Sequence, residues 1–372
     1  MFTEPISTEI VFFFILYGIT GVVPLLATIY LLLRRGNAFV PDITPPVRLR
    51  RWAAAFFAVA ALGHVWWYLV FLYSHDFQSA SYVVVAVFDC VALLTTIAGT
   101  LLAMLQDRRR PVWPAFAVMI PFVVLGGLQI LFPEKPLMTI ATIYILSIYG
   151  LFSVYMVFAV RQYGRWLNDN YADLENKKVW LSQTVLLVCL LLFILYTLVD
   201  VDTILIYILH VLEFVLFGLL LWRVETLPLL ESTSTEEVGT DLPSPNSCPS
   251  QSAAPATIDI KQIERLLKEY CEDKQLYLQH DLTLQQLAQA IGTNRLYLSQ
   301  YFSRQSITYN TYINNLRINH FINRHQEVAA AGQSFTVQKL ASESGYRSYS
   351  TFSLAFKQRM GQSVTAWIHS AE

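Results

Sequence analysis

Long apolar runs dominate the first 225 residues of the chain, and shorter amphipathic patterns replace them afterwards. A helix needs about 20 predominantly apolar residues to cross roughly 30 Å of hydrocarbon. Seven segments meet this requirement: 10–33, 52–73, 82–105, 112–132, 137–160, 179–199 and 203–222. The first run is too long for the core of a signal peptide, and no basic residue precedes it, so we expect it to remain as a span. We predict an all-α fold that begins with a seven-helix transmembrane bundle over residues 1–225.

Lysine and arginine gather in alternate loops of this predicted bundle. The first, third and fifth loops hold most of them, around residues 34–51, 108–110 and 161–178, and Arg223 follows the last span. The other loops hold only Lys135. Because basic loops stay in the cytoplasm, we expect the N-terminus outside and the C-terminus inside. The chain is then a multi-pass protein of a bacterial cytoplasmic (inner) membrane.

Four ionisable side chains lie within the predicted spans: His64, Asp89, His210 and Glu213. Such residues are costly in a bilayer, so they bind something or pair with one another. One hypothesis makes them a ligand or sensor pocket, and the other makes them hydrogen bonds that hold the helices in register. Zinc could be held by such a set, but the spacing differs from the His-Glu-x-x-His helix of zinc proteases. We therefore assign no metal, no cofactor and no catalytic residue.

Residues 226–257 are rich in Pro, Ser and Thr and contain no Lys or Arg. Low hydrophobicity with acidic charge is typical of disorder, so we predict a disordered acidic linker here. The four cysteines lack the spacing of a metal site or a disulfide framework, and we expect idle thiols.

Two similar helical units follow the linker, over Leu282–Phe302 and Phe335–Lys357, and a predicted helix over Tyr309–Arg324 joins them. Each unit has a Thr suited to an N-cap, then a Leu-Ala pair, a Gly for the turn, and a capping Asn or Ser before a second helix. The apolar residues of that helix would bury one face. The other face is then free for a DNA major groove, as in a helix-turn-helix.

Residues 258–372 resemble the DNA-binding domain of the AraC/XylS family. The resemblance rests on the following residues: Leu287-Ala288 and Gly292, Tyr312 and Leu316-Arg317-Ile318, Leu340-Ala341, Gly345-Tyr346, Phe352, Phe356-Lys357 and Gly361. It implies a tandem of homeodomain-like helix-turn-helix units that enter successive major grooves of promoter DNA. Two departures concern turns: the stretch 304–307 lacks the glycine that is usual after the first recognition helix, and 361–364 lacks the usual proline.

The resemblance also implies which side chains meet DNA. Base-facing residues in the first unit are Arg295, Leu296, Ser299 and Gln300, and in the second unit Tyr349, Ser350, Thr351 and Ser353. Four basic side chains are better placed for phosphates, which set register and affinity: Arg304, Arg347, Lys357 and Arg359.

We expect a membrane-anchored, sequence-specific transcription regulator that acts as a homodimer on double-stranded DNA and is controlled by a small-molecule or membrane signal. Two alternatives stay open. One is a transporter or channel with an accessory DNA-binding domain, and the other is an intramembrane metal-dependent hydrolase.

Overall fold

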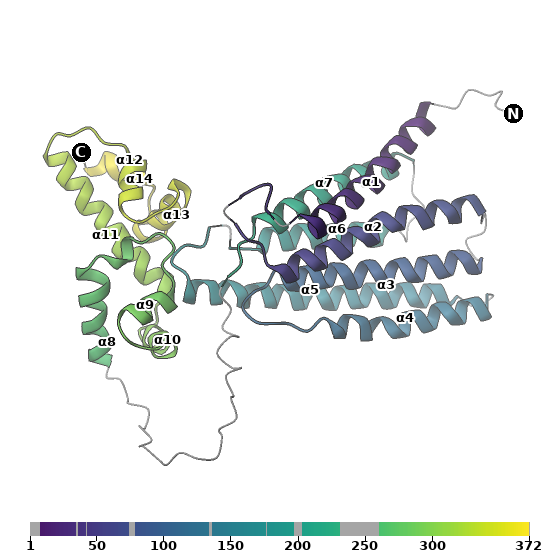
Figure 1. Cartoon of the computed structure of the whole chain (residues 1–372), viewed down its shortest axis with the longest axis horizontal. Helices are drawn as coiled ribbons and strands as arrows, with labels where there is room; N and C mark the ends of the chain where they lie inside the picture. Colours follow the sequence, from purple (N-terminus) through teal and green to yellow (C-terminus); the bar gives the residue numbers. More distant parts are fainter. Residues whose placement is uncertain are drawn as a thin grey trace, which may run out of the picture. The chain divides into compact units, whose positions relative to one another are not determined.

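The computed structural model describes residues 8–34, 36–41, 43–73, 79–133, 136–175, 177–196, 203–230 and 260–371. These residues form helices and no strand, so the all-α prediction is confirmed (Figure 1). The chain divides into two compact units. The first comprises residues 1–161 and 179–236, and the second comprises residues 162–178 and 237–372.

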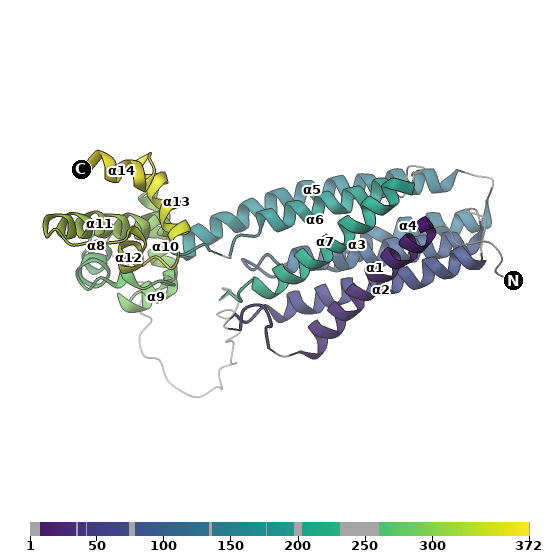
Figure 2. The ribbon, with the colours of Figure 1, turned by 90° about the horizontal axis from the view of Figure 1, so that it is seen from above.

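The first unit contains the seven predicted helices, except for residues 162–170 at the end of the fifth, which belong to the second unit. They are α1 (Thr8–Leu33), α2 (Val47–Tyr73), α3 (Ala80–Ala103), α4 (Trp113–Leu131), α5 (Leu137–Asn170), α6 (Trp180–Tyr196) and α7 (Thr203–Thr226). Six of them are long and apolar enough to cross a membrane. The exception is α6, which has 17 described residues and is followed by residues 197–202, outside the described part. Helices α2 and α3 run nearly side by side, and α1 crosses them obliquely (Figure 2).

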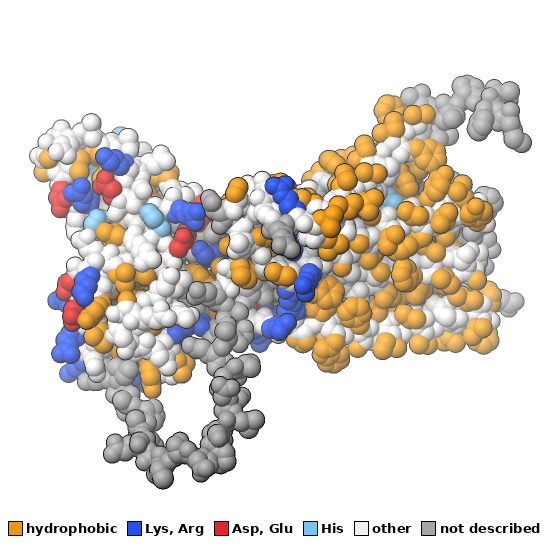
Figure 3. Space-filling view, in the orientation of Figure 1, with side chains coloured by type: hydrophobic (Ala, Val, Ile, Leu, Met, Phe, Trp, Pro, Cys, Tyr) orange, Lys and Arg blue, Asp and Glu red, His pale blue; other side chains and the backbone are white. Residues whose placement is uncertain are grey.

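Hydrophobic side chains cover the visible face of these helices (Figure 3). In water such a surface would be unfavourable, whereas in lipid it is the expected exterior. Close helix packing is possible where a glycine faces a bulky neighbour. A Cβ added at Gly99 would lie 2.3 Å from the Trp52 ring, and one at Gly126 would lie 2.4 Å from Val87.

A polar cluster centred on Glu225 ties together one end of the first unit. The Glu225 carboxylate is fully buried, pairs with Arg50 at 3.3 Å and accepts a hydrogen bond from Tyr30 at 2.9 Å. Nearby, Gln106 exchanges hydrogen bonds with the backbone of Pro228 and Leu230. Residues 226–230 of the predicted linker are therefore packed against the loops, and residues 231–259 lie outside the described part.

The second unit contains the tandem helix-turn-helix. After α8 (Ile260–Leu266), a π-helical turn and a short 3-10 turn come α9 (Leu284–Ala290), α10 (Arg295–Arg304), α11 (Tyr309–Ala330), α12 (Val337–Glu343), α13 (Tyr349–Met360) and α14 (Val364–Ala371). Helices α9 and α10 form the first helix-turn-helix, and α12 and α13 form the second. The connecting helix α11 is six residues longer than the predicted 309–324.

The N-cap residues predicted from the sequence begin the four helices of the two helix-turn-helix units. Thr283 caps α9 in a capping box with Gln286, and Thr336 caps α12. Asn294 and Ser348 cap the second helices α10 and α13. Their inner faces bury Leu298 and Phe302 in α10 and Phe352 and Phe356 in α13. Burial raises the pKa of the Cys271 thiol in this core to about 12, which fits an idle thiol.

Gly345 is the turn glycine on which the junction of the two helix-turn-helix units depends. Its φ is +87°, and a Cβ there would lie 2.9 Å from the backbone of Leu278. Beside it, Arg317 of α11 is 1% exposed and donates hydrogen bonds to the carbonyls of Tyr277, Gln279 and His280. The Arg317 guanidinium also faces the Tyr346 ring at 5.5 Å. Desolvation lowers the pKa of Arg317 from its usual value, so this charge depends on those carbonyls for its solvation.

Ser306 occupies the turn where the family resemblance would place a glycine. Its φ is +55°, and the backbone N–H groups of Ser306 and Ile307 close the end of α10 on Ser303 and Phe302. A side chain in this left-handed conformation is strained by roughly 1–2 kcal/mol. The turn after α10 therefore has the left-handed backbone conformation that favours glycine, although a serine occupies it.

Replacing Ser306 by glycine should raise the free energy of unfolding of the second unit by about 0.5–1 kcal/mol, because the strain disappears while the unfolded chain becomes more flexible. Pulse proteolysis of the full chain in urea measures this change. The matched control, Ser303→Gly in the exposed helical part of α10, should lower stability by about 0.5 kcal/mol. Equal effects of the two substitutions would contradict the assignment of strain to Ser306.

Candidate nucleic-acid interface

The exposed face of α10 carries the first set of predicted base-reading residues. Leu296 is 60% exposed and Gln300 is also exposed, whereas Ser299 is half-buried. Arg295, at the start of α10, is half-buried because its Nε and Nη2 donate to the Oδ1 of Asn170, at 2.9 Å and 2.6 Å. The exposed face of α10 thus combines Leu296 with polar side chains, and its Arg295 is hydrogen-bonded to another part of the second unit.

Helix α13 presents the second set. Tyr349 and Ser350 are exposed, and Ser353 is half-buried. The Ser350 hydroxyl lies 3.0 Å from that of the capping Ser348. Thr351 donates from its hydroxyl to the Glu175 carboxylate at 3.1 Å. In both second helices, therefore, one predicted base-reading residue contacts the segment 162–178.

The four predicted phosphate contacts differ in their surroundings. Arg304 and Lys357 are exposed. Arg347 is exposed and lies 3.5 Å from Asp281. Arg359 donates to the backbone of Asn315 and, at 2.6 Å, to the side chain of Asn319, so it also links α13 to α11. Arg304, Lys357 and Arg347 are the most available for phosphates, and Arg359 has a structural contact as well.

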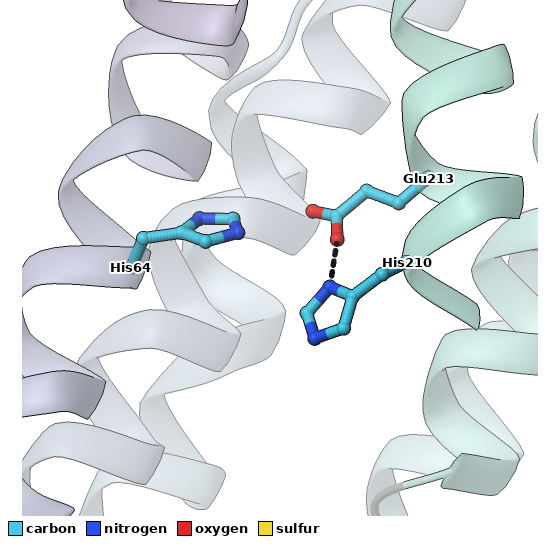
Figure 4. Close-up of side chains that lie close together, drawn as sticks. All are labelled: His64, His210 and Glu213. Atoms are coloured by element: carbon cyan, nitrogen blue, oxygen red, sulfur yellow. Dashed lines mark ion pairs between the residues drawn. The ribbon is translucent and has the colours of Figure 1, made fainter. Parts of the chain in front are cut away.

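Three of the four predicted sensor residues come together between α2 and α7 (Figure 4). One nitrogen or carboxylate oxygen from each of His64, His210 and Glu213 lies within 4.8 Å of the others. His210 and Glu213 share a helix face and approach to 3.4 Å, as their spacing predicts. Thr20 of α1 lies 3.0 Å from the Nε2 of His64.

Asp89, the fourth predicted sensor residue, has partners of its own. Its two carboxylate oxygens accept hydrogen bonds from the indole N–H groups of Trp66 and Trp67, at 3.2 Å and 3.0 Å. A Cβ at Gly63 would lie 3.2 Å from this carboxylate, so the glycine allows α2 to approach it. For Asp89 these contacts support the interhelical hydrogen-bond hypothesis.

Sequence reasoning missed three polar residues that the fold brings to prominent positions: Asn170, Glu175 and Glu225. The first two meet α10 and α13, and the third organises the end of the first unit. No spacing rule could have found them, because their partners are 125, 176 and 175 positions away in the chain.

Comparison with known proteins agrees with this geometry. Residues 287–370 match the model of a family described as a helix-turn-helix domain. These residues form an AraC-type helix-turn-helix domain, which confirms the resemblance, and they make the chain a DNA-binding transcription regulator. Searches of curated proteins and of solved structures find no match.

Proposed function

We propose that the protein is a membrane-anchored, sequence-specific regulator that reads promoter DNA with α10 and α13 and responds to a signal perceived by helices α1–α7. The observation that carries the DNA-binding part is the repeated geometry of the two units. Each second helix buries one aromatic and aliphatic face and leaves the opposite face exposed, with polar side chains beside Leu296 in α10 and beside Tyr349 and Leu354 in α13, and a major groove accepts a helix presented in this way.

Membrane anchoring is supported by the apolar surface and by the distribution of basic residues. Arg48 donates to the backbone of Arg110, and Arg50 donates to that of Arg34, so the first and third basic loops meet at one end of the first unit. Arg223 and Glu225, at the end of α7, lie at this end as well. Such a basic end favours the cytoplasmic side, where the DNA-binding unit would follow.

A signal-dependent regulator is favoured over a transporter. His64, His210 and Glu213 form one local group, and the seven apolar segments show no obvious inverted repeat of the kind on which many transporters are built. The hydrolase alternative is supported only by the same three residues. Regulation is therefore the function that accounts for both units.

Replacing Gln300 by alanine should raise the Kd for the target promoter about tenfold, because a glutamine that hydrogen-bonds a base edge contributes roughly 1–3 kcal/mol of discrimination. The target is the site that genome-wide mapping of the full-length protein selects, and fluorescence anisotropy with the full chain in detergent gives the Kd. Gln326→Ala, at an exposed position of α11, is the control and should bind as the wild type does. Equal affinities of the two variants would remove Gln300 from the interface.

The proposed orientation predicts opposite labelling of two introduced cysteines in a Cys248→Ser background. In intact cells, a membrane-impermeant maleimide should label Ala80→Cys, at the start of α3, because its loop has few basic residues. Arg109→Cys, in the exposed part of the basic third loop, should react only after permeabilisation. The reverse pattern would place the C-terminal unit outside the cell and would contradict the proposed function.

A further inference from the structure

The cluster at His64 brings two imidazoles and a carboxylate together inside an apolar bundle. One ligand atom from each of His64, His210 and Glu213 lies within 4.8 Å of the others. The Thr20 hydroxyl lies 3.0 Å from His64 Nε2 and 3.5 Å from His210 Nδ1, and its one proton also has the carbonyls of Leu16 and Tyr17 within reach. Two imidazoles beside a carboxylate are suited to a cation.

The orientation of His64 supports a metal rather than a proton at this centre. Its Nδ1 lies 2.9 Å from the carbonyl of Ala60, which can only accept, so this nitrogen carries the hydrogen. The Nε2 lone pair is therefore directed toward the cluster. Metal-binding histidines commonly donate their other N–H to a carbonyl in this way, which fixes the tautomer and the ring orientation.

The surroundings also hold the ligands in place. Tyr17 donates to the backbone of His64 at 2.6 Å, and its ring lies against both imidazoles. Phe13, which lies on α1 as Tyr17 does, also contacts the His210 ring. A Cβ at Gly21 would lie 3.3 Å from the His64 Cβ, so the glycine lets α1 approach α2 at this level.

We propose that His64, His210 and Glu213 bind a divalent transition metal, for which zinc is the probe. Two imidazoles and one carboxylate form the ligand set of zinc sites that keep an open fourth position. Helix bundles build such sites from an acidic residue and a histidine three positions apart. The site goes beyond the proposed function, since it holds whether or not the chain binds DNA.

The test loads the purified full-length protein with Zn²⁺ or Co²⁺ in detergent. We expect one equivalent of Zn²⁺ and the visible spectrum of four-coordinate Co²⁺. His64→Gln, His210→Gln and Glu213→Gln should each weaken binding at least about tenfold, because the loss of a partner that only orients a ligand already costs roughly 10–100-fold. Asp89→Asn is the matched control, because its carboxylate is held by two indoles, and it should retain the metal.

Replacing His210 by cysteine tests whether this residue binds the metal directly or only supports the fold. His210→Cys should still bind Co²⁺ and should add a sulfur-to-cobalt charge-transfer band, which unfolding or loose packing cannot produce. The proposal is overturned if the folded wild type binds no metal, or if the three glutamine variants bind it as tightly as Asp89→Asn does.

A second inference rests on different contacts, those of the segment 162–178 inside the second unit. This segment comprises the end of α5 and the loop after it, and the core of the first helix-turn-helix includes its Ala172, which is 2% exposed. The Ala172 N–H donates to the carbonyl of Leu282, and Asn310 donates to the carbonyls of Tyr171 and Ala172. The segment is thus an integral part of the unit.

The same segment contacts both helices that read DNA. Asn170 accepts two hydrogen bonds from Arg295 of α10, and Glu175 accepts one from Thr351 of α13. The Glu175 carboxylate also brings negative charge to a surface that must approach phosphates, where like charges repel. While the Nε and Nη2 of Arg295 donate to Asn170, they cannot also donate to the two acceptors on the edge of a guanine.

We infer that residues 162–178 and DNA compete for α10 and α13. This inference rests on the proposed function, whose DNA-reading surface it uses. The segment continues from a candidate span, α5, so a change in that helix could alter the competition. A signal that reaches α5 then need not pass through the predicted linker, 226–257.

Removing the contacts that residues 162–178 make with α10 and α13 should strengthen DNA binding by the full chain. We expect Asn170→Ala and Glu175→Gln each to lower the Kd for the mapped promoter about five- to tenfold, the effect of losing one or two competing hydrogen bonds. Asn168→Ala, on the same turn of α5, is the matched control and should leave the Kd unchanged. A gain in affinity cannot arise from misfolding.

The inference is overturned if Asn170→Ala and Glu175→Gln bind DNA no more tightly than Asn168→Ala. Failure of the proposed function looks different, because then the wild type and all the variants fail to select any DNA site.

Discussion

Arg317 carries a charge in the interior of the second unit, where it is 1% exposed. Three backbone carbonyls from the turn at 277–280 accept its hydrogen bonds, and the Tyr346 ring lies beside the guanidinium. Removing one partner from a buried charge costs about 3–5 kcal/mol. The connecting helix, the turn before the first helix-turn-helix and the start of the second are therefore held at one junction. The spacing of α10 and α13 depends on this junction.

The same constraint, that a buried polar group needs a partner, organises the first unit at two levels. At one end, the buried Glu225 accepts a hydrogen bond from Tyr30 and pairs with Arg50. Within the bundle, Asp89 accepts hydrogen bonds from two indoles, whereas His64 and His210 both lie near the Thr20 hydroxyl and Glu213 lies beside His210. The four ionisable residues of the predicted spans therefore fall into two sets. Asp89 links helices by hydrogen bonds, and the other three form the group whose ligand atoms are close enough together for one cation.

Local patterns predicted most of the second unit, because caps, turns and helix faces depend on residues only a few positions apart. Thr283, Asn294, Thr336 and Ser348 are all caps, and Gly292 and Gly345 both have positive φ. The missing glycine after α10 was also visible in the sequence. What the chain does instead was not visible, since a serine at φ +55° is held there by the surrounding turn and not by its own preference.

The sequence by itself determined the seven apolar helices, the tandem helix-turn-helix and the faces of α10 and α13, because hydrophobic period and capping act within a few residues. It also placed His210 and Glu213 on one face. Only the tertiary structure decided that His64 joins them from another helix and that Asp89 does not. The tertiary structure also decided that α5 extends to Asn170 and that residues 162–178 meet α10 and α13. The contacts of Asn170 and Glu175 join positions more than 100 residues apart. A periodic pattern along the chain gives the faces of one helix and does not show which distant side chains will form a hydrogen bond.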